Sequence, residues 1–304
     1  MATAKRFFGI LFIVLAIYLM VLYWFFPFSS ESISNNIKTS NFQINSTSLT
    51  SMQFYDNLRY SNKDISYRIY DCTLAKENEM QEAFKIIENE TILNFYNVSE
   101  NEEISITCDS KNKIKEGMFI GGEGGPTNIT KTDNFNVIEM GSILLLRETK
   151  CAQPNIALHE LLHALGFDHS ENPNNVMYPV VKCAQTIGED IPKLIDELYS
   201  YPTLPDLTLQ DVHAFMDGRF LNLNFTIRNY GLEDSKNGTV IIYADDSELK
   251  QMEVKPLEIG TGRMMSLTNL FISKINLNSV KIVVKYDNEE LTKDNNQVIL
   301  QIKK

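Results

Sequence analysis

The chain has 304 residues, of which 43% are hydrophobic, and this length and composition fit one or two domains with buried cores. Its 39 acidic residues outnumber its 28 basic residues, which gives a formal net charge of -11. A nucleic-acid-binding protein would show a basic face, so the charge argues against a nucleic-acid partner.

Residues 7–28, which follow Lys5 and Arg6, carry no charge and predict a transmembrane helix. As an α-helix this segment would be about 33 Å long, enough to cross the hydrocarbon core of a membrane. A cleavable signal peptide has a shorter apolar region, of roughly 7–15 residues, and a small-x-small cleavage site, which is missing here. We therefore expect residues 1–28 to be an uncleaved, single-pass anchor in the cell membrane, with the N-terminus inside and the rest of the chain extracytoplasmic.

The cysteines fit such a location, because an even number of cysteines outside the cytoplasm suggests disulfides. Among the connectivities that four cysteines allow, we favour Cys72 with Cys108 and Cys151 with Cys183. If the topology is different, the alternative is a set of reduced core thiols. Asn-x-Ser/Thr triplets, each a weak signal for glycosylation, occur at Asn45, Asn89, Asn97, Asn128, Asn224 and Asn237.

Residues 29–55 are rich in Ser, Asn and Thr, show little apolar periodicity and predict a flexible stalk. After the stalk, alternating apolar residues predict strands at 64–72 and 103–110, and apolar residues at helical spacing predict a helix within 77–98. If the two strands run parallel, the cysteines near their ends become neighbours, which is why we pair Cys72 with Cys108.

The glycine-rich segment 117–128 predicts a loop, residues 135–148 predict further strand, and residues 188–200 predict a closing helix. This order of strands and helices predicts an α+β fold, built as α/β layers, over residues 56–200.

The two prolines within residues 201–209 mark a domain boundary. Beyond them the chain contains short alternating runs separated by Asn, Gly and Asp turns, at residues 220–231, 238–245, 264–273, 279–287 and 296–302. This spacing predicts an all-β immunoglobulin-like sandwich over residues 205–304.

The stretch HELLHALGFDHSENPNNVMYP, residues 159–179, holds three of the four histidines of the chain. On a helix its leucines would form a buried stripe, while His159 and His163 would lie one turn apart on another flank. Gly166 permits the left-handed turn that ends a helix, so the chain can double back and bring His169 to the same point. Three imidazoles and one open position predict a catalytic zinc site.

Glu160 follows the first histidine and would project beside this metal. Because zinc lowers the pKa of water to about 7, a neighbouring carboxylate can take the proton as general base and later hand it to a leaving amine. If the three histidines were instead unrelated core residues, each would need its own buried polar partner. His213 stands outside any motif, and we expect it to be structural or exposed.

HELLHALGFDH matches the zinc signature of the metzincin metallopeptidases, H-E-x-x-H-x-x-G-x-x-H, and NVMYP resembles their Met-turn. Within that clan, Ser170 and the MYP sequence resemble the matrixins (peptidase M10-type), and the resemblance covers about residues 60–200. It implies an endopeptidase acting on protein or peptide substrates. His159, His163 and His169 would bind zinc, and Glu160 would be the general base.

The same resemblance implies that Met177 forms a hydrophobic floor under the metal. It also implies that Pro179, Val180 and Val181 wall the pocket for the side chain after the scissile bond. An edge strand within residues 136–146 would pair with an extended substrate. Tyr178 is expected to be a packing residue.

The sequence departs from the matrixin pattern at Leu162, where matrixins usually have glycine. The glycine-rich segment 119–128 lacks the histidine of the matrixin loop that it resembles, so we expect no structural second zinc. Structural calcium at Glu123 and nearby carbonyls has weak support. The chain has no PRCGxPD latency switch, and residues 29–55 are too short for a folded prodomain.

Residues 205–304 resemble the CARDB-type immunoglobulin-like domain of microbial surface proteins, through the stretches PDLTL, FTIRNYG, VIIYAD and YDNEELTKDNNQVIL. We expect this domain to be a spacer, and the alternative is a surface that binds a partner for adhesion or substrate presentation.

The sequence as a whole predicts a membrane-anchored, extracytoplasmic zinc endopeptidase. One alternative is a cell-surface adhesion or structural protein with a non-catalytic zinc domain. It would close the zinc shell with a fourth protein ligand and would not need Glu160. Another is a zinc amidase acting on cell-envelope polymers, which would share the chemistry and differ only in the substrate cleft.

Overall fold

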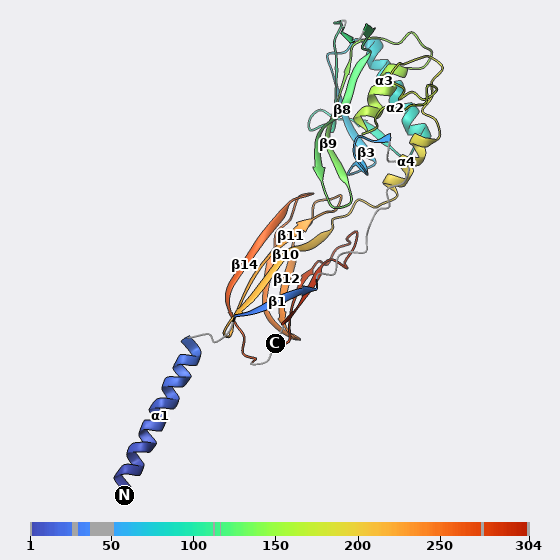
Figure 1. The fold of residues 1–304 in the computed structure, drawn as a ribbon. Coiled ribbons are helices and arrows are strands. Elements are labelled where there is room, and N and C mark those ends of the chain that lie inside the picture. The colour runs from blue at the N-terminus through green and yellow to red at the C-terminus, as the bar shows by residue number, and fades with distance from the viewer. Residues whose placement is uncertain are drawn as a thin grey trace. The chain divides into compact units, whose positions relative to one another are not determined.

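The structure of the protein is a computed structural model that describes residues 2–25, 30–36, 52–111, 113–115, 117–274 and 277–302. Apart from the N-terminal helix, the described residues fall into two compact units (Figure 1). The α/β unit contains residues 52–205 and 230–234, and the β-sandwich unit contains residues 206–229 and 235–302 together with residues 30–36.

The N-terminal helix α1 (Ala2–Phe25) covers most of the segment predicted as a membrane anchor. Among the described residues, no helix is both long enough and apolar enough for a membrane span. The structure therefore does not support the transmembrane helix predicted at residues 1–28.

The α/β unit is built on a sheet of five parallel strands and one antiparallel strand. Parallel pairing connects β2 (Leu58–Tyr60) to β9 (Asn136–Leu145), β9 to β5 (Ile104–Cys108), β5 to β3 (Asp64–Tyr70) and β3 to β4 (Asn94–Asn97). The antiparallel strand β8 (Gly122–Lys131) pairs with β9. Helices α2 (Leu74–Glu90) and α3 (Asn155–Ala164) pack against each other, and α4 (Asp190–Tyr199) follows them in the chain (Figure 1). The mixed α/β architecture agrees with the sequence.

Helix α2 ends earlier than the predicted range of 77–98. It starts after the N-cap Thr73 and stops at Glu90, because Thr91 adopts an extended conformation while its N–H and hydroxyl both donate to the Ile87 carbonyl. The next residues form β4, which pairs with β3. Phe95 keeps its contact with the helix from this strand, with its ring 4.6 Å from that of Phe84. The helical spacing of apolar residues continues beyond Glu90, but residues 94–97 pair with a strand and do not extend the helix.

The segment 117–128 is not the predicted loop. It contains β7 (Met118–Phe119), which forms a small hairpin with β6 (Ile114–Lys115), and most of β8. The glycines allow helix α3 to pack closely against β8, since a Cβ atom at Gly124 would lie 2.2 Å from the Glu160 carbonyl oxygen. Glycine is therefore needed for packing at this point of the strand.

The prediction of an edge strand within residues 136–146 is also wrong. These residues form β9, which has β8 on one side and β2 and β5 on the other. No other strand of the described chain pairs with β8, so β8 is the edge of the sheet.

Both predicted disulfides are confirmed. Cys72 and Cys108 join the ends of the parallel strands β3 and β5, with their Cα atoms 5.0 Å apart. Cys151 and Cys183 join the segment before α3 to the segment before α4, also at a Cα separation of 5.0 Å.

The β-sandwich unit is built from antiparallel strands in the order β13–β12–β15–β16–β1–β10–β11–β14. Their bounds are β1 (Ser30–Asn36), β10 (Leu207–Asp217), β11 (Phe220–Asn229), β12 (Gly238–Ala244), β13 (Ser247–Val254), β14 (Gly262–Phe271), β15 (Ser279–Lys285) and β16 (Gln297–Ile302). Alternate residues of β12 and β15 are buried, as expected for an all-β fold with one core-facing side. His213, on β10, is exposed.

Part of the predicted stalk is strand. Residues 30–36 form β1, which pairs with β10 and β16. Residues 37–51 of the predicted stalk lie outside the described residues.

Candidate metal centre

Helix α3 places the first two histidines of the motif beside the sheet. Its leucine stripe is buried, and the neighbouring imidazoles of His159 and His163 are buried with it. The helix ends as the sequence predicts, at Gly166, which has a φ of +99°. A Cβ atom at this glycine would also lie 2.7 Å from the Leu58 side chain, so both the conformation and the space require glycine. The chain then turns back toward the helix.

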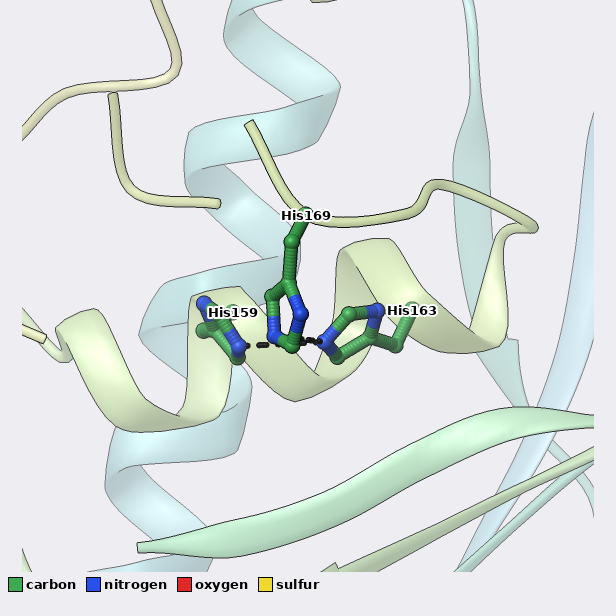
Figure 2. A group of neighbouring side chains, drawn as sticks. All are labelled: His159, His163 and His169. Atoms are coloured by element: carbon green, nitrogen blue, oxygen red, sulfur yellow. Dashed lines mark hydrogen bonds between the residues drawn. The ribbon is translucent and has the colours of Figure 1, made fainter. Parts of the chain in front are cut away.

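The turn brings the three imidazoles together, as Figure 2 shows. Nε2 of His163 lies 3.0 Å from Nε2 of His159 and 3.2 Å from Nε2 of His169. Two of the rings come from α3 and the third from the loop that follows it. The three histidines form a group that could hold a metal ion, with ligand atoms all within 4.8 Å of one another.

The partners of the other ring nitrogens show why these atoms suit a metal. Nδ1 of His159 lies 2.7 Å from the Val176 carbonyl, and Nδ1 of His163 lies 2.8 Å from the Phe167 carbonyl. A carbonyl only accepts hydrogen bonds, so each neutral ring carries its proton on Nδ1 and directs the Nε2 lone pair at the other histidines. Lone pairs this close repel one another unless a cation lies among them.

Burial keeps two of these rings in the neutral form. It lowers the pKa of His159 to about 4, and it also lowers the pKa of His163. Metal binding requires neutral imidazole, and outer hydrogen bonds to carbonyls are the usual way to orient such ligands. Three neutral histidine nitrogens are the donor set of many catalytic zinc sites, so the residues fit zinc.

Glu160 is buried in the same helix and lies under β8. The pKa of its carboxyl group is raised to about 8, mainly by burial and also by the charge of Glu123, while a hydrogen bond from the Gly124 N–H opposes both. A dication at the three histidines would favour the charged carboxylate. A carboxyl group with such a pKa can exchange a proton near neutral pH, which is the property that a general acid–base requires.

Two glycines of β8 belong to this site and were not predicted to do so. A Cβ atom at Gly122 would lie 2.6 Å from Cγ of Glu160, and one at Gly124 would meet the backbone of the same residue. The glycine cluster was visible in the sequence, but its role in admitting Glu160 depends on β8 lying against α3.

Met177 occupies a buried turn that connects the ligands. Its N–H donates to Oδ1 of Asn175 at 2.8 Å, and its carbonyl accepts from the N–H of Ser170 at 2.9 Å. The turn therefore joins the residue after His169 to the segment whose Val176 carbonyl binds His159.

The residues predicted to wall a substrate pocket follow this turn. Pro179 and Val180 are exposed and Val181 is half-buried, and Tyr178 is half-buried with its N–H donating to the Asn175 carbonyl at 3.0 Å. They lie in the loop that starts directly after the buried Met177.

A segment from the end of the predicted stalk also contacts the site. The N–H of Phe54 donates to the Gly166 carbonyl at 3.1 Å, and the N–H of Asp168 donates to the Met52 carbonyl at 2.8 Å. The Phe54 ring stacks on His163 with their centroids 5.6 Å apart. These contacts lie on either side of the turn that leads to His169. No motif or periodicity in the sequence predicted them.

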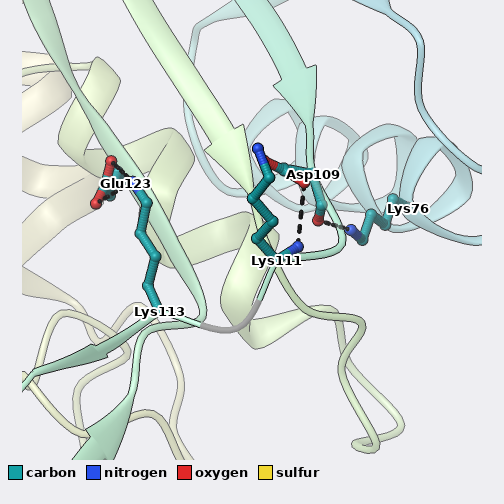
Figure 3. A network of polar contacts seen from close by, with 5 residues as sticks. All are labelled: Lys76, Asp109, Lys111, Lys113 and Glu123. Atoms are coloured by element: carbon teal, nitrogen blue, oxygen red, sulfur yellow. Dashed lines mark hydrogen bonds and ion pairs between the residues drawn. The ribbon is translucent and has the colours of Figure 1, made fainter.

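The structure does not support the predicted calcium site at Glu123. Its carboxylate accepts from Nζ of Lys113 at 3.0 Å, and both side chains are exposed (Figure 3). A lysine ammonium in this position competes with a cation, so structural calcium at Glu123 is not supported. Figure 3 also shows Lys76, whose buried ammonium donates to the Asp109 carbonyl at 2.7 Å and thereby ties α2 to the residue after β5.

Comparison with known proteins adds to this geometry. Residues 59–200 match the matrixin (peptidase M10) family model, and residues 204–299 match the CARDB model. The chain is 25% identical to rat (Rattus norvegicus) macrophage metalloelastase over 175 residues, which cover 51% of this chain and 32% of that protein. It is also 25% identical to rat stromelysin-1 over 213 residues, covering 62% of this chain and 43% of that protein. The chain thus spans less than half the length of either relative.

Two solved structures resemble this chain, each over 33% of its length. One is the CARDB domain of a Pyrococcus furiosus protein, with 16% identity, 88% of that chain covered and a TM-score of 0.27. The other is a domain of a Methanosarcina acetivorans protein, with 21% identity, 93% of that chain covered and a TM-score of 0.26. From the two family matches, the chain combines a matrixin-like metallopeptidase domain with a C-terminal CARDB-like domain.

Proposed function

We propose that the α/β unit is a zinc-dependent endopeptidase that hydrolyses peptide bonds with Glu160 as the general base. The observation that carries this proposal is the convergence of three histidine Nε2 atoms, with the buried Glu160 on the helix that carries two of these histidines. The matrixin match supports a zinc endopeptidase in general.

His159, His163 and His169 would hold the zinc ion. Zinc, when bound, lowers the pKa of water and polarises the substrate carbonyl. The Glu160 carboxylate would accept the proton of the attacking water and pass it to the nitrogen of the leaving amine, so that no net charge accumulates on the residue. Its raised pKa favours the first of these transfers, because it makes the carboxylate a stronger base, and the Gly124 N–H would orient the carboxylate.

Substrate binding is proposed along the edge of β8. An extended peptide could add to this strand through main-chain hydrogen bonds, since the strand has a partner on one side only among the described strands. Met177 would form the floor under the metal, and Pro179, Val180 and Val181 would wall the pocket for the side chain after the scissile bond.

An extracytoplasmic location is proposed on the evidence of the two disulfides, since such bonds persist in oxidising compartments. Attachment to a membrane rests only on the apolar sequence of residues 7–28 and stays a prediction. For the CARDB-like domain we propose a spacer role, with a surface partner as the alternative.

The test uses a proteome-derived peptide library digested with the purified full chain, with and without a chelator. The Glu160→Ala variant should keep its zinc and lose about 10²–10⁴-fold in cleavage rate, because only the proton transfer is removed. Undiminished turnover by this variant would refute the role of Glu160.

The same digest separates the alternatives. A non-catalytic zinc domain would cleave nothing and would hold its metal with a fourth protein ligand. Among the described residues the His, Cys, Asp and Glu side chains supply three such ligands and no fourth, which favours the enzyme. A zinc amidase would spare peptides but release fragments from cell-envelope polymers.

A further inference from the structure

The loop that starts at the buried Met177 has hydrogen bonds between its two ends, and it is linked to a metal ligand. We name residues 177–186 the wall loop. The N–H of Val176 donates to the Thr186 carbonyl at 2.7 Å, and the N–H of Thr186 donates to the Asn174 carbonyl at 3.1 Å. Because the Val176 carbonyl also accepts from Nδ1 of His159, the base of the loop has a fixed position relative to this ring.

Gln185 fixes the interior of the wall loop. Its side chain is only 2% exposed. Oε1 accepts from the N–H of Lys182 at 2.6 Å, and Nε2 donates to the carbonyls of Val180 and Pro173, both at 3.1 Å. One side chain therefore satisfies three backbone groups, which a loop of this length would otherwise expose to water.

Two further connections tie the tip of the loop to the start of α3 and to the segment just before it. Asn155 is fully buried, and its Nδ2 donates to the Lys182 carbonyl at 2.7 Å. The disulfide joins the neighbouring Cys183 to Cys151. Asn155 lies one helical turn before His159, so the tip of the loop is held to the same helix that carries the metal ligands.

The loop nevertheless presents side chains to solvent. Val180 is 38% exposed and Pro179 is exposed, although the carbonyl of Val180 is bonded to Gln185. A wall with a fixed backbone and accessible side chains suits substrate recognition, because little conformational entropy is lost when a ligand packs against it.

We propose that Asn155, Gln185 and the Cys151–Cys183 disulfide act as a brace that fixes the wall loop and thereby determines which residue is accepted after the scissile bond. This inference rests on the proposed endopeptidase function. The three elements are positioning groups, and hydrolysis itself does not require them. A dithiol reductant would convert the disulfide to two thiols, becoming a disulfide itself, and would release one of the two tethers.

The experiment compares two double variants of the full chain, Cys151→Ser/Cys183→Ser and the control Cys72→Ser/Cys108→Ser. The two bridges span 32 and 36 residues, so their removal should destabilise the fold by nearly the same amount in the chain-entropy model. Each variant digests the peptide library, and kcat, KM and zinc content are then measured on the best peptide. Asn155→Ala provides the same test without a change in disulfides.

We expect the Cys151→Ser/Cys183→Ser and Asn155→Ala variants to accept a broader set of residues after the scissile bond. Their KM should rise about tenfold, with kcat within about twofold of the wild type and zinc content unchanged, because binding is affected and chemistry is not. The control should keep the wild-type preference.

An unchanged preference in both test variants, with an active wild type, would overturn the brace and leave the endopeptidase proposal intact. Equal broadening in the control would also overturn it, since general destabilisation would then explain the effect. A wild-type chain that cleaves no peptide would overturn the proposed function and the brace together.

Discussion

The two units arrange neighbouring polar groups in different ways. In the α/β unit, His159, His163 and His169 turn their Nε2 atoms toward one point. In the sandwich, the oxygens of Glu290 accept from the Leu207 N–H at 2.9 Å and from Nδ2 of Asn296 at 2.7 Å. Polar groups that satisfy one another stabilise a fold, whereas polar groups that converge without satisfying one another indicate a ligand.

The largest expected effect, on zinc binding and peptide cleavage, comes from removing one of the three converging histidines. His163→Ala should lose the bound zinc and, with it, all measurable peptide cleavage, because His163 contributes the nitrogen closest to both other ligands. His213→Ala is the matched control, since this histidine is exposed on β10 of the sandwich. Zinc content by elemental analysis, together with the cleavage rate, checks both. Retention of zinc by His163→Ala would contradict the proposed ligand set.

A smaller effect is expected where β8 meets α3. Gly124→Ala would place a Cβ atom 2.2 Å from the Glu160 carbonyl oxygen and should cost about 1–3 kcal/mol of unfolding free energy, with a loss of activity as Glu160 shifts. Gly125→Ala has open space at its Cβ position and serves as the control. Urea unfolding and peptide cleavage are the measurements. Equal behaviour of the two variants would show that the close approach is unimportant.

The Phe54 contact should matter less. Phe54→Ala removes the ring stacked on His163, an interaction of about 0.5–1.5 kcal/mol, and should speed zinc release to a chelator by up to about tenfold. Tyr55→Ala, at an exposed neighbouring position, should leave the rate unchanged. If both variants release zinc at the wild-type rate, residues 52–54 have no part in holding the site.

The smallest expected effect is on how the stability of the sandwich depends on pH. Burial raises the pKa of Glu290 to about 7, so between about pH 4.5 and 7 the folded state keeps a proton that the unfolded state has lost. The contribution of this group to stability is therefore present at low pH and declines as the pH rises through this window. Glu290→Gln should flatten the decline, by up to about 2 kcal/mol once solvent screening is discounted. Urea unfolding at pH 5 and pH 7.5 tests this, and an identical decline in both proteins would contradict it.

Local spacing explains what the sequence could predict. The separation of His159 and His163 by one helical turn, the glycine at 166 and the alternation in the strands around Cys72 and Cys108 are local patterns, and the structure has the helix, the turn and the disulfide. Patterns of this kind also predicted the α/β layers and the sandwich.

The remaining features depend on contacts between distant segments. Gly124 belongs to a strand that pairs with β9 and lies against α3, and the buried Gln185 bonds backbone groups as far away as Pro173. Phe54 reaches His163 across more than a hundred residues of chain. Neither hydrophobic period nor motif spacing carries such information, since side-chain-to-backbone bonds leave no repeat in the sequence.

The coordination of zinc in crystals of the zinc-loaded full chain, located by anomalous diffraction, tests the central claim most directly. The account predicts one zinc ion bound by the Nε2 atoms of His159, His163 and His169 at about 2.0–2.1 Å, with solvent in the remaining position. A protein side chain in that position, or a zinc ion that leaves one of the three rings unbound, would contradict it.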